Sequence, residues 1–158
     1  MKKTLLLITI LLISAACFAQ TTPANLYGFG ASFNNGASVP VAGSGLYAHS
    51  LTDGTYAFGM LDVLPNTVKP FTVTTNLSTG IAQKVFTVGS VPIYVPTSAG
   101  VSFSGSNTGW SWSTGGMAVV RIKKTNWYVM PNIRVAKSSV SGGTGYQPIF
   151  GAMFGWGN

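Results

Sequence analysis

Few residues in this sequence could perform acid–base or nucleophilic chemistry. The chain has no glutamate, a single histidine, His49, and only two aspartates, Asp53 and Asp62. Glycoside hydrolysis needs two carboxyl groups that face one substrate, and a zinc site draws its ligands from several Cys, His or carboxylate side chains. One histidine and two separated aspartates supply neither set. We therefore expect no metal ion and no cofactor.

A Ser-His-Asp arrangement is possible on paper, with Ser50 or another serine, His49 and either Asp53 or Asp62. However, adjacent residues of a strand point to opposite faces, which separates His49 from Ser50. Ordinary structural roles are better supported: Asp53 as a turn residue, Asp62 as a solvated strand end and His49 as an interfacial side chain. The sequence thus indicates a protein without enzymatic activity.

Two glycine patterns resemble phosphate-binding loops, Gly28-Phe29-Gly30 and the run at 141–145. A phosphate loop must lead into a helix, and neither segment is followed by a helical pattern. Glycine in these segments more plausibly allows strands to curve and pack closely.

The composition indicates strands with lipid on one side. Charged residues make up 7% of the chain, against about 25% in an ordinary soluble domain. Beyond Leu12 no apolar run approaches the roughly 20 residues of a membrane-spanning helix, and 46% hydrophobic residues argue against disorder. Apolar residues that alternate with small polar ones are typical of transmembrane β-barrels.

The basic residues are scattered, although the formal net charge is +7. Grooves that bind single-stranded nucleic acid combine a basic surface with aromatic side chains on which bases stack, and the sequence contains no such run. We expect no nucleic-acid partner, and contact with lipid phosphates explains the charge better. Beyond the N-terminus these residues are Lys69, Lys84, Arg121, Lys123, Lys124, Arg134 and Lys137.

The N-terminus has the pattern of a secretory signal. Met1-Lys2-Lys3 is positive, residues 5–12 form an apolar run, and small residues precede an expected cleavage site after Ala19. We predict a signal peptide over 1–19 and a single domain over 20–158. Lipid attachment at Cys17 is the alternative, although Ser14 stands where such a site prefers a branched apolar residue.

The mature sequence reads as about eight antiparallel strands with alternating apolar and polar residues. We treat 89–113 as one long loop, because Pro92 and Pro96 would interrupt a central strand, with a hidden hairpin as the alternative. The strands are expected at 27–33, 42–51, 55–64, 71–77, 81–88, 118–123, 127–135 and 146–156.

The connections fall into two classes. Short turns at 53–54, 78–80 and 124–126 lie on one side, and longer connections after Phe33, Leu64, Val88 and Ser138 lie on the other. Short periplasmic turns and long outer loops are the usual asymmetry of outer-membrane barrels. We therefore place the short turns, together with both termini, in the periplasm.

Aromatic residues fit this orientation, because Trp and Tyr favour the level of the lipid headgroups. Tyr27, Trp127 and Trp156 fall at periplasmic strand ends, and Phe33 and Tyr146 fall near outer strand ends. We expect all five to be interfacial.

Two cations fall on the predicted inner face, Arg121 and Arg134. We expect neither to face lipid, because a cation near the bilayer midplane costs about 2 to 4 kcal/mol. With so few acids in the chain, water or backbone carbonyls should satisfy their hydrogen bonds.

The last strand ends in glycine followed by aromatic residues at alternating positions, Gly151, Phe154 and Trp156. In this it resembles the small bacterial outer-membrane β-barrel proteins, the class that includes the OmpA transmembrane domain. The resemblance implies that the barrel-assembly machinery reads this strand as an assembly signal. Two features depart from the family pattern: Phe150 replaces a usual polar residue, and Gly157-Asn158 follow the final aromatic.

These observations predict an all-β, up-and-down transmembrane barrel in the outer membrane, with outer-membrane lipid and the assembly machinery as partners. A barrel of this size is filled by its own side chains, so its outer loops are the expected functional surface, in a structural or interaction role without an identified ligand. Two alternatives are a soluble secreted or surface-attached β-sandwich resembling an adhesin, and a lipid-modifying barrel enzyme.

Overall fold

The computed structural model describes residues 23–34, 41–66, 72–140 and 146–158. The predicted signal peptide over 1–19, with the alternative lipidation site Cys17, lies outside the described residues, as do Lys69 and the glycine run at 141–145. Among the described residues, no helix is long and apolar enough to cross a membrane.

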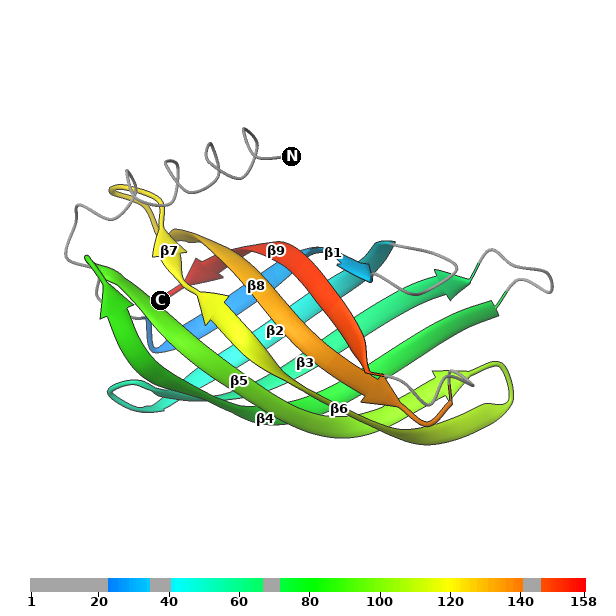
Figure 1. Ribbon diagram of the computed structural model, residues 1–158. Helices are drawn as coiled ribbons and strands as arrows, with labels where there is room; N and C mark the ends of the chain where they lie inside the picture. The colour runs from blue at the N-terminus through cyan, green and yellow to red at the C-terminus, as the bar shows by residue number, and fades with distance from the viewer. Residues whose placement is uncertain (1–22, 35–40, 67–71, 141–145) are drawn as a thin grey trace, which may run out of the picture.

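The described chain folds into one antiparallel sheet (Figure 1). The segments β6 (Asn107–Ala118) and β7 (Val120–Arg121) are parts of one strand that is interrupted at Val119, so the barrel has eight strands. The interruption lies opposite Met130 and Pro131, where the proline has no backbone N–H to donate. The segments are β1 (Asn25–Asn34), β2 (Val41–Thr52), β3 (Thr55–Asn66), β4 (Thr72–Val88), β5 (Val91–Ser104), β6 (Asn107–Ala118), β7 (Val120–Arg121), β8 (Trp127–Ser138) and β9 (Gln147–Gly157).

The sheet closes on itself. Each strand pairs with its sequence neighbours, β1 pairs with β9, and β6 pairs with β8 across the β7 segment. Following register partners once round from Tyr128 returns to the same strand at Ser138, ten residues further along. This stagger requires strongly tilted strands, as in small barrels generally. Closure overturns the β-sandwich alternative, which needs two facing sheets with open edges.

The predicted turn at 78–80 is wrong. Strand β4 continues without a break for 17 residues, and Ser78, Thr79 and Gly80 pair with both neighbouring strands. Gly80 is needed here for space, because a Cβ atom would collide with the carbonyl oxygen of Thr97. Glycine inside a strand marks such close backbone approach as well as a turn.

The predicted loop over 89–113 is also wrong, because a full hairpin of β5 and β6 occupies it. Two-residue turns start with Gly89 (φ 62°) and Gly105 (φ 58°), each followed by a serine. Glycine at the first position is the signature of a type II′ hairpin turn. Pro96 does not end β5; pairing with β6 merely lapses between Tyr94 and Thr97. The spurious turn adds one strand and the missing β5 removes one, because the expected strand at 118–123 already stands for the strand that β6 and β7 form. The predicted strand number is therefore confirmed.

The barrel has two different ends. The terminal end carries residues 23–24, Asn158 and the turns at 53–54, 89–90 and 122–126 (Figure 1). At the opposite end, called the loop end, β1, β3 and β8 end, β2, β4 and β9 begin, and the turn at 105–106 joins β5 to β6. The connection after Val88 therefore lies at the terminal end as a tight turn, and was wrongly assigned to the long loops.

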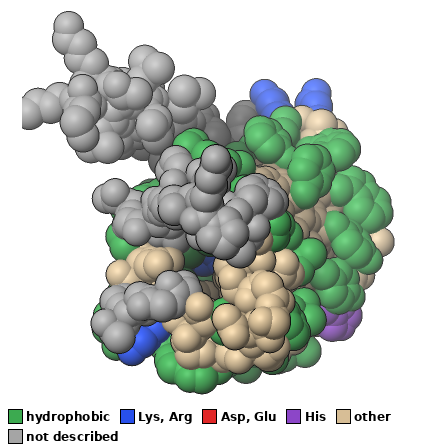
Figure 2. All heavy atoms as spheres, turned by 90° about the vertical axis from the view of Figure 1, so that its right-hand side faces the viewer, with side chains coloured by type: hydrophobic (Ala, Val, Ile, Leu, Met, Phe, Trp, Pro, Cys, Tyr) green, Lys and Arg blue, Asp and Glu red, His purple; other side chains and the backbone are tan. Residues whose placement is uncertain are grey.

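Side chains alternate between the wall and the interior along every long strand. In β2, for example, Leu46 and Ala48 are buried, whereas Tyr47 between them is exposed. Large apolar side chains face outward all round the wall, among them Phe29, Leu61, Leu77, Ile133 and Phe154. Figure 2 looks onto the loop end, and hydrophobic side chains cover much of the wall that is visible there.

Adjacent glycines in β6 provide a matched test of closure. We expect Gly115→Ala to lower the free energy of unfolding by about 1 to 3 kcal/mol, because the new Cβ would collide with the carbonyl oxygen of Ile133 across the β6–β8 seam. In Gly116→Ala the Cβ would meet only the Ile133 Cγ2 atom, at 3.8 Å, an ordinary contact. Urea titration in lipid vesicles measures both, and equal stability of the two variants would contradict close packing at this seam.

Candidate functional site

The barrel interior is divided into an apolar and a polar half. Toward the terminal end, large side chains such as Tyr94 and Met130 are completely buried in an apolar cluster. Toward the loop end the interior is lined by small polar groups. The buried polar and charged residues are Ser32, Ser44, Asp62, Ser78, Ser98, Ser102, Ser111, Ser113 and Arg134.

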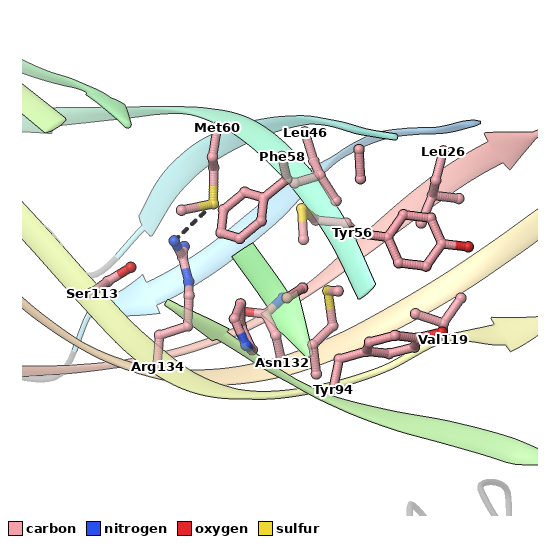
Figure 3. A pocket seen from close by; sticks show the side chains of 15 residues that line it. Leu26, Leu46, Tyr56, Phe58, Met60, Tyr94, Ser113, Val119, Asn132 and Arg134 are labelled. Carbon is pink, nitrogen blue, oxygen red and sulfur yellow. Dashed lines mark hydrogen bonds between the residues drawn. The ribbon is translucent and has the colours of Figure 1, made fainter. Parts of the chain in front are cut away.

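An ion pair lies where the two halves meet. Arg134, on β8, is only 4% exposed. Its guanidinium donates to both carboxylate oxygens of Asp62 on β3, at 3.1 and 3.2 Å. It also donates to the Met60 sulfur at 2.9 Å (Figure 3). Ser44 donates to the same carboxylate at 2.5 Å. A cation from one side of the barrel is thus held by an acid from the other side.

This pair corrects two predictions. Asp62 is buried rather than a solvated strand end, and Arg134 is held by a carboxylate rather than by water or backbone carbonyls. The sequence contained the signal for Asp62, because it lies an even number of residues from Tyr56, Phe58 and Met60, the inward face of β3. Its partner is 72 residues away and could not be read from local pattern.

Arg121 lies at the rim of the terminal end, opposite the buried Tyr128. Its Nε atom donates to the Thr125 carbonyl at 2.6 Å, and Nη2 donates to the Asn126 side chain at 3.3 Å. Arg121 thus lies at the end of β7, next to the turn into β8.

Two small cavities occupy the interior. The first, of about 30 Å³, is bounded mainly by the apolar cluster, with Arg134 and Ser113 at one end and Leu26 and Val119 at the other (Figure 3). The second, of about 40 Å³, lies in the polar half beside Asp62. A cavity of this size holds about two to three waters.

Hydroxyl groups line the polar cavity and bond to one another. Ser98 and Ser113 are 2.9 Å apart, and Ser102 donates to Asn76 at 2.6 Å while accepting from Ser138 at 2.9 Å. The Ser111 hydroxyl is buried without a protein partner. This surface is suited to ordered water, and the described residues include no cluster of three His, Cys, Asp or Glu that could hold a metal ion.

The structure does not assemble the Ser-His-Asp arrangement. His49 is on the outward face, with its Nδ1 atom 2.8 Å from the Asn25 side chain, and Ser50 donates to the Thr52 carbonyl. Asp53 is an exposed turn residue that pairs with Lys84 at 3.7 Å. Asp62 is in the interior, on the other side of the wall from His49.

Aromatic side chains gather on the wall near both ends. At the terminal end Tyr27 stacks on Trp156 with ring centroids 5.8 Å apart, and Trp127 pairs in register with Trp156. Tyr47, 5.1 Å from Tyr27, extends this group and was not singled out from the sequence. We call Tyr27, Tyr47, Trp127 and Trp156 the aromatic cluster.

At the loop end Phe33 and Tyr146 face outward, and Tyr146 packs edge-on against Trp112 at 5.7 Å. The Lys137 ammonium lies 5.4 Å from the Tyr146 ring and 5.9 Å from the Trp110 ring. The alternation of Trp110 and Trp112 was the available sequence signal for these residues, and it was hidden by the loop assignment.

The residues of the predicted assembly signal lie on both faces of β9. Phe154 and Trp156 point outward, and Gly151 faces inward against Ser32 of β1. Strand β9 is paired on both sides, with β1 and with β8. Recognition of this strand by the assembly machinery stays a prediction.

No family model matches the sequence, and no curated protein matches it. Solved structures with the same fold include the N-terminal β-barrel domain of Pseudomonas aeruginosa OprF, with a TM-score of 0.61, 11% identity, and coverage of 87% of this chain and 98% of that chain. A de novo designed transmembrane β-barrel is similar with a TM-score of 0.52, 11% identity, and coverage of 87% and 99%. The chain has the fold of a small outer-membrane β-barrel.

This outer-membrane barrel fold confirms the predicted architecture, an eight-stranded antiparallel barrel of the OmpA transmembrane-domain type. The likeness extends to the fold alone, since identity is 11% in both comparisons. The function must therefore be argued from the wall, the ends and the interior of this barrel.

Proposed function

We propose that the protein is an outer-membrane barrel with a structural or surface-interaction role, without enzymatic activity, and that the connections at the loop end are its interaction surface. The observation that carries this proposal is the outward wall. Large apolar side chains such as Leu61, Leu77 and Val101 stand exposed in register on three adjacent strands. Water would penalise such a surface, whereas hydrocarbon favours it.

The proposal includes export and orientation. The predicted signal peptide at 1–19 would direct secretion, leaving 20–158 as one domain. The tight turns at 53–54 and 89–90 are two residues long, and they lie at the end that also holds Asn158. Short turns support a periplasmic location for the terminal end. Assembly would use the β9 residues Gly151, Phe154 and Trp156.

The interior supports a role other than transport. The terminal half is filled by an apolar cluster in which Tyr94 and Met130 are fully buried, and the two cavities measure about 30 and 40 Å³. An eight-stranded barrel has room for its own side chains and little more. We therefore propose that the protein acts through its outer surface, where loops tolerate sequence variation.

Membrane fractionation tests the proposal. We expect the protein in the outer-membrane fraction, extracted by detergent but not by urea, because its wall is apolar and its sheet has no free edge. On a gel, the unheated protein should migrate differently from the boiled protein, since a closed barrel resists unfolding by detergent. A matched sample unfolded in urea and left without lipid is the control. A protein that urea extracts, and whose migration does not depend on heating, would refute the membrane assignment.

A further inference from the structure

The turn between β7 and β8 concentrates positive charge at the terminal end. Arg121, Lys123 and Lys124 occupy three of four successive positions, and both lysines are exposed. This is the densest group of cations among the described residues, because Lys84 is alone on β4 and Arg134 and Lys137 are further apart on β8.

The turn is held in shape by its own hydrogen bonds. Ile122 donates its backbone N–H to the Trp127 carbonyl at 2.8 Å, and the Thr125 hydroxyl donates to the Ile122 carbonyl at 2.8 Å. Arg121 adds its bond to the Thr125 carbonyl. Lys124 takes a left-handed conformation, with φ 59°, which reverses the chain. Because the backbone of the turn is already ordered, binding a ligand here costs little further conformational entropy.

The chain contains only two acidic side chains, and each pairs with a cation on another strand. Asp53 pairs with Lys84, and Asp62 pairs with Arg134 inside the barrel. Both acidic side chains thus pair with cations outside the turn, and the three cations at this strand end raise the positive potential around the terminal end.

Apolar and aromatic groups adjoin the cations. Ile122 and Trp127 are both exposed beside the turn. Trp127 belongs to the aromatic cluster, where it pairs in register with Trp156, which stacks on Tyr27. Tyr and Trp rings are favoured at the headgroup level of a bilayer. Lysines that adjoin such rings lie at the depth of the lipid phosphates. The anion that these lysines would meet in a bilayer is therefore the phosphate group of a lipid.

We propose that the β7–β8 turn and the aromatic cluster together bind an anionic phospholipid headgroup in the leaflet at the terminal end. The phosphate accepts charge-assisted hydrogen bonds from Lys123 and Lys124, and the rings of Trp127 and Trp156 contact the glycerol and upper acyl region. This inference rests on the proposed membrane function, and it adds a lipid class to that function.

Native mass spectrometry of the barrel in detergent micelles tests the site, with phosphatidylglycerol titrated against phosphatidylcholine. Each lysine near an anionic lipid surface contributes about a fivefold factor in affinity. The double variant Lys123→Gln/Lys124→Gln should therefore bind phosphatidylglycerol about 25-fold more weakly, while its binding of phosphatidylcholine stays unchanged. Lys137→Gln, which removes one cation at the opposite end, is the matched control and should bind like the unchanged protein.

The heat-dependent gel shift is recorded for every variant, so that loss of the barrel itself is distinguished from loss of the lipid site. A folded double variant that still prefers phosphatidylglycerol, or a Lys137→Gln variant that loses the preference equally, would overturn the proposal. If inorganic phosphate, at the same concentration as the lipid, displaced phosphatidylglycerol, the site would be a simple anion site, which would also overturn the proposal. So would equal binding of an acidic peptide by the folded protein.

Discussion

Replacing Arg134 with methionine will lower the free energy of unfolding of the barrel by about 3 to 5 kcal/mol, the cost of leaving one partner of a buried ion pair without the other. Asp62 is 7% exposed and accepts two hydrogen bonds from the guanidinium. In the variant its carboxylate would keep only the Ser44 hydroxyl as a donor among the described contacts. Asp62→Asn should destabilise for the same reason, because the buried guanidinium then lacks its counter-charge.

The double variant Arg134→Met/Asp62→Asn should recover part of this loss, because no buried charge is left unpaired. Urea unfolding in lipid vesicles, followed by tryptophan fluorescence, gives all four stabilities of the cycle. Lys84→Met is the matched control, since it breaks the solvent-exposed pair with Asp53 and should cost at most about 1 kcal/mol. If Arg134→Met cost no more than Lys84→Met, the ion pair would not link the two sides of the barrel.

A second large effect is expected on the lipid-facing wall. Leu77 is 55% exposed in the middle of β4 and stands between Leu61 and Val101 of the adjacent strands. An arginine at such a position near the bilayer midplane costs about 2 to 4 kcal/mol, falling to about 0 to 1 kcal/mol at the interface. We therefore expect Leu77→Arg to lower the free energy of unfolding strongly. In a water-soluble protein the same exposed substitution would be almost neutral.

Val88→Arg is the matched control for this depth dependence. Val88 is 52% exposed on the same strand, directly before the tight turn at Gly89. Its substitution should have little effect, because the guanidinium there reaches water. Equal costs for the two variants, measured by the same vesicle titration, would mean that β4 does not cross the hydrocarbon. The contrast therefore tests the membrane assignment independently of cell fractionation.

The two predictions concern opposite faces of one wall. On the proposed membrane function, the outward face contacts hydrocarbon and a charge at mid-depth is costly. On the inward face, the charge of Arg134 is neutralised by its partner across the lumen. Small polar groups next to this pair, such as Ser98 and Ser113, leave room for water without opening the apolar half. This division leaves the exposed ends as the regions available for partners.

Alternation alone was sufficient to predict the class of fold. The outward positions of Phe29, Leu77 and Phe154 follow from period-two patterning, which is a local property of extended chain. The low content of charged residues, without a long apolar run, indicates strands that contact lipid on one face. The alternating aromatic residues of β9 are the pattern that resembles the outer-membrane barrels. These signals are local in the sequence and do not depend on contacts between distant residues.

Turn positions could not be settled by local chemistry in the same way. Ser78-Thr79-Gly80 and Gly89-Ser90 contain similar small residues, but the first continues a strand and the second reverses it. The difference lies in neighbours: at Gly80 the backbone of β5 approaches so closely that no Cβ fits, while Gly89 takes a left-handed conformation. The predicted strand number is correct only because the spurious turn in β4 adds one strand and the missed strand β5 removes one.

The partners inside the lumen were decided by closure. Asp62 and Arg134 are separated by 72 residues, and neither residue's local pattern identifies the other. They meet because the sheet returns to β8 with a stagger of ten residues, which sets the height at which every inward side chain faces the opposite wall. Alternation thus determined which face each residue occupies, and the register of the closed sheet determined which residues it faces there.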